Sequence, residues 1–313
     1  MPFKPALAIA IALLFAPTTQ AQVNNGITAP VTAEIFVDEP FRGTEGITFS
    51  NEGRLFVSGN RAVWEVMPNG STRKLADLDS NLGLAAFGER DILAADFGPT
   101  NAFRHQRNND GVVWRITPEG EKTAYVTGLG DPNAIIVRDD GSLLISDDAT
   151  NEIFVFDEAN GLRLFSTAVN HPNGIVLSHD RKTLYVAQIF KSIRPVIRDD
   201  SLWAIELNSE GTPAPKAPKR VAQTGPMAAN DGLAIDKEGR IYIAANGPAG
   251  EVWRYDPLSE TVSMIADNMP GAASLEFGRG AFDHSSLYVT TTFSGGRGGK
   301  VYRIKTDTTG APR

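Results

Sequence analysis

The chain has 313 residues, of which 42% are hydrophobic and 21% charged, with 30 Lys and Arg against 37 Asp and Glu. This composition is globular, and a net charge of −7 without a basic tract argues against nucleic acid or an anionic membrane as a partner. There is no Cys and there are only four His, which excludes disulfides, thiolate metal sites and a cysteine nucleophile. Any chemistry must therefore rest mainly on oxygen groups.

The N-terminus has the pattern of a secretory signal peptide. Lys4 is followed by an apolar run over residues 6–16 and then by the small-residue cleavage site Thr19-Gln20-Ala21. The apolar run is too short to remain as a membrane span. We therefore expect a signal peptide over residues 1–21, an exported protein (periplasmic or secreted), and a single mature domain over residues 22–313 with no membrane association.

The rest of the chain is a repeat of β-strand patterns. Two alternating apolar runs, joined by a turn of charged residues and glycine, recur six times, beginning at Gly46, Gly83, Ala134, Gly174, Gly232 and Ser274. Several copies continue into a third and a fourth strand-like run, and the copies begin 37 to 58 residues apart. Four strands per repeat at this spacing predict an all-β fold, a six-bladed β-propeller with four-stranded blades. Two stacked β-sandwiches would not explain six copies in phase.

The two ends of the chain predict how the ring closes. The last copy has only three strands and finishes with the run over residues 300–305, whereas an unassigned strand-like run at residues 31–37 precedes the first copy. We expect this N-terminal strand to complete the sixth blade, which protects an otherwise exposed sheet edge.

One position of the repeat is rich in oxygen donors. The residues immediately before the six copies are Glu45, Leu82, Asn133, Asn173, Asp231 and Ala273. Asn or Asp at one such position is an ordinary turn former, but four oxygen donors in phase on separate blades indicate a site on the channel axis. Two carboxylates and two amides suit Ca²⁺, whereas Mg²⁺ prefers a smaller, water-rich shell. Other divalent metals remain open.

At these positions the chain resembles a known superfamily. The strings Thr44-Glu45-Gly46-Ile47, Asp131-Pro132-Asn133-Ala134, Pro172-Asn173-Gly174-Ile175 and Asn230-Asp231-Gly232-Leu233 are similar to those of the superfamily of SMP-30, gluconolactonases, luciferin-regenerating enzyme and diisopropylfluorophosphatase. The resemblance implies a six-bladed propeller with a channel metal, usually Ca²⁺, that hydrolyses lactones or related esters. It implies Glu45, Asn133, Asn173 and Asp231 as metal ligands and favours Asp231 as the catalytic residue that orients or activates water.

Further residues are expected on the same face of the ring. Asn101, Arg104 and His105 lie in the connection over residues 96–110, and His171 lies two residues before Asn173. These four are candidates for substrate contact, the alternative being solvated loop residues. His179 and His284 are expected in turns on the opposite face.

Three connections between second and third strands are expected to be long or glycine-rich loops, at residues 96–110, 188–200 and 292–299. Lysine and arginine in the first two favour an anionic or hydroxyl-rich substrate, or are ordinary solvated charge. The sequence thus predicts a metal-dependent hydrolase, with Ca²⁺ as cofactor, of a small lactone such as an aldonolactone. The alternatives are phosphotriester hydrolysis at the same metal, and a non-enzymatic periplasmic propeller that binds a ligand or a protein around a structural metal. The expected partner is a small-molecule substrate, without an obligate protein partner.

Overall fold

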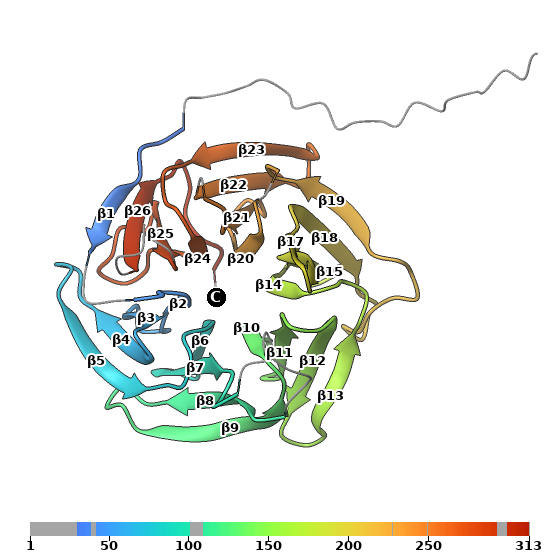
Figure 1. Cartoon of the computed structure of the whole chain (residues 1–313), viewed down its shortest axis with the longest axis horizontal. Helices are drawn as coiled ribbons and strands as arrows, with labels where there is room; N and C mark the ends of the chain where they lie inside the picture. Colours follow the sequence, from blue (N-terminus) through green and yellow to red (C-terminus); the bar gives the residue numbers. More distant parts are fainter. Residues whose placement is uncertain are drawn as a thin grey trace, which may run out of the picture.

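The computed structural model describes residues 30–38, 42–100, 109–226, 228–248, 250–292 and 299–312. In this part of the chain every regular element is a β-strand, and six antiparallel sheets of four strands surround one central axis (Figure 1). The predicted six-bladed β-propeller is confirmed. No helix capable of crossing a membrane occurs in these described segments. The predicted signal peptide, 1–21, lies outside them.

Each blade runs from an innermost strand at the axis to an outermost strand at the rim. Blade one contains β2 (Ile47–Phe49), β3 (Leu55–Gly59), β4 (Ala62–Val66) and β5 (Thr72–Asp77). Blade two contains β6 (Leu84–Phe87), β7 (Asp91–Asp96), β8 (Gly111–Ile116) and β9 (Lys122–Leu129). Blade three contains β10 (Pro132–Val137), β11 (Leu143–Asp147), β12 (Glu152–Asp157) and β13 (Gly161–Ser166).

The second half of the ring repeats this order. Blade four contains β14 (Pro172–Leu177), β15 (Thr183–Gln188), β18 (Ser201–Glu206) and β19 (Lys219–Gln223). Blade five contains β20 (Asn230–Ile235), β21 (Ile241–Ala245), β22 (Glu251–Asp256) and β23 (Thr261–Ala266). Blade six contains β24 (Ala272–Phe277), β25 (Ser286–Thr291), β26 (Lys300–Lys305) and β1 (Glu34–Val37).

The ring closes as the sequence predicts. Strand β1 pairs antiparallel with β26, with Glu34 opposite Arg303 and Ile35 opposite Tyr302. The Arg303 guanidinium lies 2.6 Å from the Glu34 carboxylate, which adds an ion pair between residues 269 positions apart in the chain. The outer edge of blade six is therefore covered by the start of the chain, and the two ends of the domain are held in one sheet.

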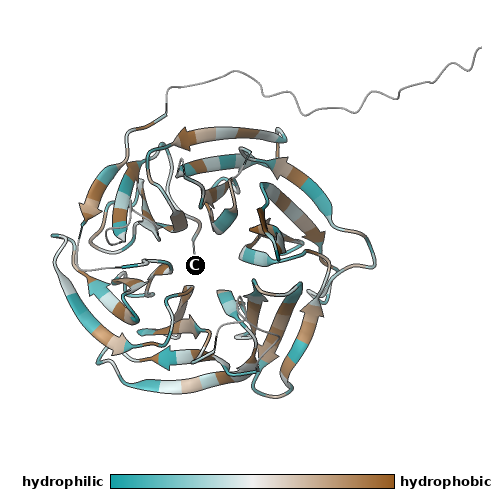
Figure 2. Cartoon of the chain, in the orientation of Figure 1, coloured by the Kyte–Doolittle hydropathy of each residue, from teal (hydrophilic) through white to brown (hydrophobic). Residues whose placement is uncertain are grey.

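Burial is most complete on the second strands of the blades. Strand β3 is buried at all five positions, whereas the outermost strand β5 is buried at one of its six positions. Figure 2 shows the same gradient, with hydrophilic residues frequent on the outermost strands. Between blades, the sheets pack face to face on large side chains; Phe49 meets Phe282 and Tyr288 with ring centroids 5.1 and 5.8 Å apart. Packing between neighbouring sheets thus forms the core.

The expected loop over residues 188–200 is instead mostly a second small sheet. Strands β16 (Phe190–Ile193) and β17 (Val196–Arg198) form a hairpin between β15 and β18. Its register places Ile193 opposite Val196, so the turn is tight, and alternating apolar and polar residues allow pairing. The hairpin is exposed, with Val196 at 62% of its accessible surface.

Candidate metal centre

The six residues that precede the repeats form one buried ring. Each lies at or next to the beginning of an innermost strand, and all six are buried, including Asp231 at 2% and Glu45 at 8% exposure. The four with oxygen side chains line the same central cavity as the innermost strands. The structure therefore brings Glu45, Asn133, Asn173 and Asp231 together at one end of the channel, with the apolar Leu82 and Ala273 in the two remaining positions.

Glycine follows most of these residues for a steric reason. A Cβ atom at Gly46 would lie 2.1 Å from the carbonyl oxygen of Leu82, and one at Gly174 would lie 2.2 Å from the carbonyl oxygen of Asp231. Neighbouring innermost strands thus approach backbone to backbone where the ring is narrowest. The repeated Glu-Gly, Asn-Gly and Asp-Gly pairs are the sequence trace of this close approach.

Hydroxyl groups on the second strands hydrogen-bond backbone groups at and next to the ring residues and hold the ring in place. Ser146 accepts a hydrogen bond from the Ala134 N–H (3.0 Å) and donates one to the carbonyl of Asn173 in the next blade (2.6 Å). Ser58 makes the equivalent pair with the Gly46 N–H and the Leu82 carbonyl, both at 2.8 Å. Thr290 donates to the carbonyl of Glu45, which joins the last blade to the first. Each bridge ties a candidate site position to its neighbouring blade.

Replacing Ser146 by Ala is expected to reduce the free energy of unfolding by about 1–3 kcal/mol, because the buried Asn173 carbonyl and Ala134 N–H lose their partner. Chemical denaturation at saturating and zero Ca²⁺ measures this change. The matched control is Ser259→Ala at an exposed hairpin, where the hydroxyl lies 2.8 Å from Thr261 Oγ1 on the surface and no change is expected. Equal stability of the two variants would contradict the bridging role.

The carboxylates of the ring are held in an unfavourable environment for negative charge. The Glu45 and Asp231 side chains interact within this ring, and burial raises the pKa of both carboxyl groups above the usual range. The pKa of Asp148 is also raised, first by burial and then by the neighbouring charges of Asp147 and Asp131. Three acidic side chains are therefore concentrated in one desolvated region, where a cation would replace the missing solvation.

Two residues of this region were missed by sequence reasoning. Asp148 follows β11 and accepts a hydrogen bond from the Asn133 amide nitrogen (3.1 Å), and Asn246 follows β21 and donates to Asp231 Oδ2 (2.7 Å). Asn246 also donates to Thr292 Oγ1 at 2.9 Å. Their position in the repeat was the available signal, because polar residues directly after a second strand lie on the same face of the propeller as the ring. The hydrogen bond to Asp148 uses the amide nitrogen of Asn133, so the amide oxygen of Asn133 faces away from Asp148. The hydrogen bond from Asn246 holds Oδ2 of Asp231 in place.

His171 adjoins the same region. Its Nδ1 lies 2.8 Å from the backbone carbonyl of Asp148, which can only accept, so Nδ1 carries the hydrogen in the neutral ring. The ring packs edge-on against Phe190 of the β16–β17 hairpin, with centroids 6.2 Å apart. The predicted contacts Asn101, Arg104 and His105 lie outside the described residues. His179 and His284 are exposed, and His179 lines the opposite end of the channel.

The residues present fit a hard divalent cation. Asp231 Oδ1 and Asp148 Oδ1 are buried and have no hydrogen-bond partner among the described residues. Such orphaned oxygens, beside others fixed by Asn246 and Asn133, are typical of carboxylates arranged around an ion. Among the described residues, no group of three or more His, Asp or Glu side chains is placed to hold a metal. A metal at this ring would therefore also need the amide oxygens of Asn133 and Asn173 as ligands.

The fold and the ring define a class: six-bladed propellers with a buried cluster of oxygen donors at one mouth of the channel. Residues 148–293 match the family described as the SMP-30/Gluconolactonase/LRE-like region. The resemblance that the sequence strings indicated is thereby confirmed for this part of the chain.

Individual relatives agree with the family match. A gluconolactonase of Zymomonas mobilis is 24% identical over 254 residues, which cover 79% of this chain but only 60% of that protein. A solved gluconolactonase from Xanthomonas campestris has a TM-score of 0.68 at 19% identity, covering 87% of this chain and 88% of its own. The calcium-binding protein regucalcin from Agrobacterium tumefaciens has a TM-score of 0.65 at 19% identity, covering 91% and 98%. The structural likenesses establish a shared fold.

Proposed function

We propose that this protein is a metal-dependent hydrolase of small lactones, with an aldonolactone as the representative substrate and Ca²⁺ as the metal. The observation that supports this most strongly is the ring of Glu45, Asn133, Asn173 and Asp231 at one channel mouth, with an orphaned carboxylate oxygen on Asp231. The relationship to a family that includes gluconolactonases supports the choice of reaction.

The four ring residues would hold the cation, with Asp148 and Asn246 orienting two of them. When bound, the cation supplies polarisation of the lactone carbonyl and compensation for the developing oxyanion charge. Hydrolysis adds one water: the water oxygen bonds to the carbonyl carbon, the ring C–O bond breaks, and a proton from water ends on the departing oxygen.

Asp231 is the residue best placed to orient the attacking water. Asn246 fixes its Oδ2, which leaves Oδ1 to accept a hydrogen bond from a water molecule at the ring. His171, on the same side, offers a second polar contact for substrate hydroxyl groups through its Nε2.

The decisive experiment is turnover of a panel of aldonolactones, aryl esters and phosphotriesters by the purified protein, with and without EDTA. Lactone hydrolysis that EDTA abolishes and Ca²⁺ restores is the expected result. Preference for phosphotriesters would favour the alternative hydrolase. No turnover at full Ca²⁺ occupancy would favour a binding propeller with a structural metal.

Ca²⁺ is expected to raise the melting temperature of the EDTA-treated protein. A ligand that binds only the native state at a concentration of about 100 Kd adds roughly 2.7 kcal/mol, which corresponds to about 5 °C or more for a chain of this size. Differential scanning calorimetry in EDTA, in Ca²⁺ and in K⁺ at equal ionic strength measures the effect. An unchanged transition in Ca²⁺, Mg²⁺ and Mn²⁺ would contradict the metal centre.

The predicted signal peptide belongs to the same proposal, which places the mature enzyme outside the cytoplasm. Determination of the N-terminal sequence of the secreted or periplasmic form tests it, with cleavage after Ala21 expected.

A further inference from the structure

The central channel continues well beyond the ring of oxygen donors. The cavity has a volume of about 620 Å³ and is lined by the innermost strands of all six blades. Along β10, Asn133 belongs to the ring and Ile136 lies three residues further, about 10 Å along an extended strand. A volume of this size is in the range of small-molecule sites, and the metal centre occupies only one end of it.

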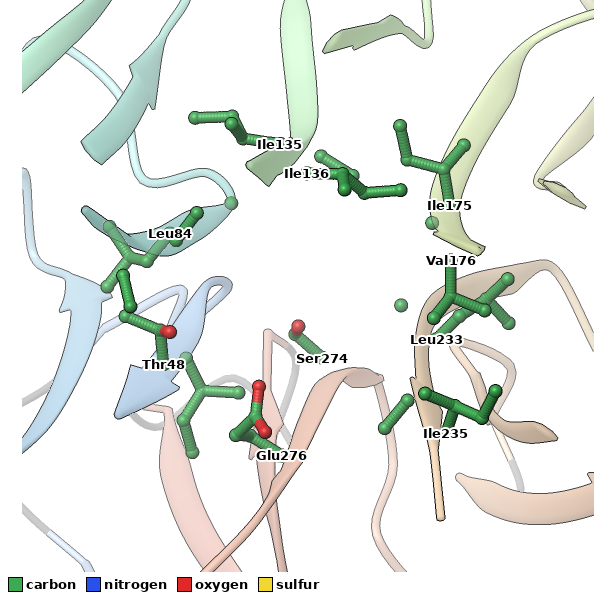
Figure 3. A pocket seen from close by; sticks show the side chains of 18 of the residues that line it. Thr48, Leu84, Ile135, Ile136, Ile175, Val176, Leu233, Ile235, Ser274 and Glu276 are labelled. Carbon is green, nitrogen blue, oxygen red and sulfur yellow. The ribbon is translucent and has the colours of Figure 1, made fainter. Parts of the chain in front are cut away.

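The wall of this inner channel has two different sides. Blades three, four and five contribute aliphatic side chains, and Ile136, Val176, Leu233 and Ile235 remain partly exposed although they lie at the centre of the molecule. Blades six and one contribute the polar side chains Thr48, Ser274 and Glu276. Figure 3 shows both groups around the open centre, with Ile136 across from Ser274 and Glu276, and Leu233 and Ile235 on the blade beside them.

Partial exposure of these aliphatic residues is informative because their neighbours on the next strand are fully buried. Leu144 and Ile243 pair with Ile136 and Leu233 and have no exposed surface. The exposed area of the innermost side chains therefore faces the channel, where it contacts water in the absence of another molecule. Covering apolar surface of this kind by a hydrocarbon chain is favourable in proportion to the area removed from water.

The mouth opposite the metal centre offers a polar entrance. Its rim contains Arg181, which pairs with Asp139 at 2.8 Å, and Arg279, which donates to the carbonyl of Ala311 at 2.7 Å. The Ala311 N–H in turn donates to the carbonyl of Ile235, so the end of the chain is held at this mouth (Figure 1). Because this rim carries both positively and negatively charged side chains, it does not select an anionic ligand.

We propose that the inner channel is a second binding site, for a short aliphatic molecule that carries a hydrogen-bond donor, such as an alcohol or a protonated amine. The hydrocarbon chain lies against Ile136, Val176, Leu233 and Ile235, and the donor group bonds the Glu276 carboxylate on the polar side. Glu276 lies 3.9 Å from Arg279 Nε, which holds its carboxylate toward the entrance side. The site is separate from the ring that binds the metal.

Binding of 1-butanol, 1-hexanol and 1-octanol to the full chain, loaded with Ca²⁺, tests the proposal by isothermal titration calorimetry. Each added methylene group is expected to tighten binding about threefold to fourfold until the channel is filled. Octylamine should bind at least as tightly as 1-octanol, and octanoate at least ~10-fold more weakly, because Glu276 repels a second carboxylate. Affinities that do not depend on chain length, or tightest binding of octanoate, would overturn the proposal.

Two variants locate the binding. Val176→Phe narrows the channel and should weaken 1-octanol binding at least ~10-fold, whereas Ile136→Val removes one methylene contact and should weaken it about twofold to fourfold without threatening the fold. The control is Leu258→Ala at a side chain that is 92% exposed on the rim, where binding should not change. Unaltered binding in Ile136→Val, or equal weakening in Leu258→Ala, would place the ligand elsewhere. These readouts do not involve lactone turnover, so their outcome is independent of the proposed hydrolase activity.

Discussion

Replacing Asp231 by Asn is expected to lower kcat/KM for the lactone substrate by at least ~100-fold and to weaken Ca²⁺ binding by a factor of about 10 to 100. Asp231 is the candidate ligand with the most complete set of constraints. It is buried, its Oδ2 accepts a hydrogen bond from Asn246, and its Oδ1 has no hydrogen-bond partner among the described residues. Asparagine preserves the shape but removes the charge that attracts the cation.

The same variant has a second, opposite effect that separates a ligand from a structural residue. In EDTA the wild-type site holds Asp231 close to Glu45 and Asp148, whose charges add to burial in raising the pKa of Asp231, so one fewer carboxylate relieves repulsion. Metal-free Asp231→Asn is therefore expected to melt at the same temperature as the metal-free wild type or higher, while its response to Ca²⁺ is lost. Calorimetry with and without Ca²⁺, combined with lactone turnover, measures both effects.

The control for this prediction is Asp77→Asn, on the outermost strand of blade one. Its side chain is 79% exposed and pairs with Lys74 on the surface, so both activity and Ca²⁺ response should be unchanged. Full activity and full Ca²⁺ affinity in Asp231→Asn would remove Asp231 from the site and leave the ring without its most constrained ligand.

Gly174→Ala is expected to produce the second large effect, a loss of about 2–3 kcal/mol in the free energy of unfolding. The added Cβ would lie 2.2 Å from the carbonyl oxygen of Asp231 and 2.8 Å from the backbone nitrogen of Leu233. Both are backbone atoms of the adjacent blade, which cannot rotate away as a side chain can. Blades four and five must therefore move apart. Because Gly174 directly follows Asn173 and faces the backbone of Asp231, this movement widens the ring at the candidate metal centre.

Urea denaturation measures the stability of Gly174→Ala, and Ca²⁺ titration measures the distortion of the ring. The matched control is Ala134→Gly, at the same position of blade three, where a Cβ is already accommodated. This change removes little packing and should cost about 0.5–1 kcal/mol through the flexibility of glycine. If the two variants were equally stable, the close approach of blades four and five would not be the reason for glycine at position 174.

Several features of the fold are predictable from residues that are close together in the chain. The alternation in the strings beginning at Gly46 and Gly232 predicted inner strands that occur at β2 and β20, because strand pairing and tight turns depend on residues near in the chain. The incomplete repeats at both ends of the chain predict that the N-terminal run joins the sixth blade, and β1 lies there. The ring position of Asn173 was also readable, since a repeat gives equivalent residues equivalent places.

Other features depended on contacts between distant residues. Asp148 and Asn246 became visible as partners of Asn133 and Asp231 only once second strands were placed in register beside first strands. The β16–β17 hairpin differs from the predicted loop because its short strands pair with each other and not with a blade. The two-sided channel was not foreseen, because it requires side chains from six blades to meet across the axis.

The sequence by itself determined the repeat, its phase, the closing strand and the family resemblance, because these follow from local alternation, turn chemistry and the order of strings along the chain. Tertiary structure alone decided which charges share a desolvated space, which hydroxyl groups bridge adjacent blades, and how near the innermost strands lie to each other. The physical reason is distance: burial, hydrogen bonding and backbone contact at the axis join residues tens to hundreds of positions apart, such as Glu45 and Thr290. No local pattern records such distances.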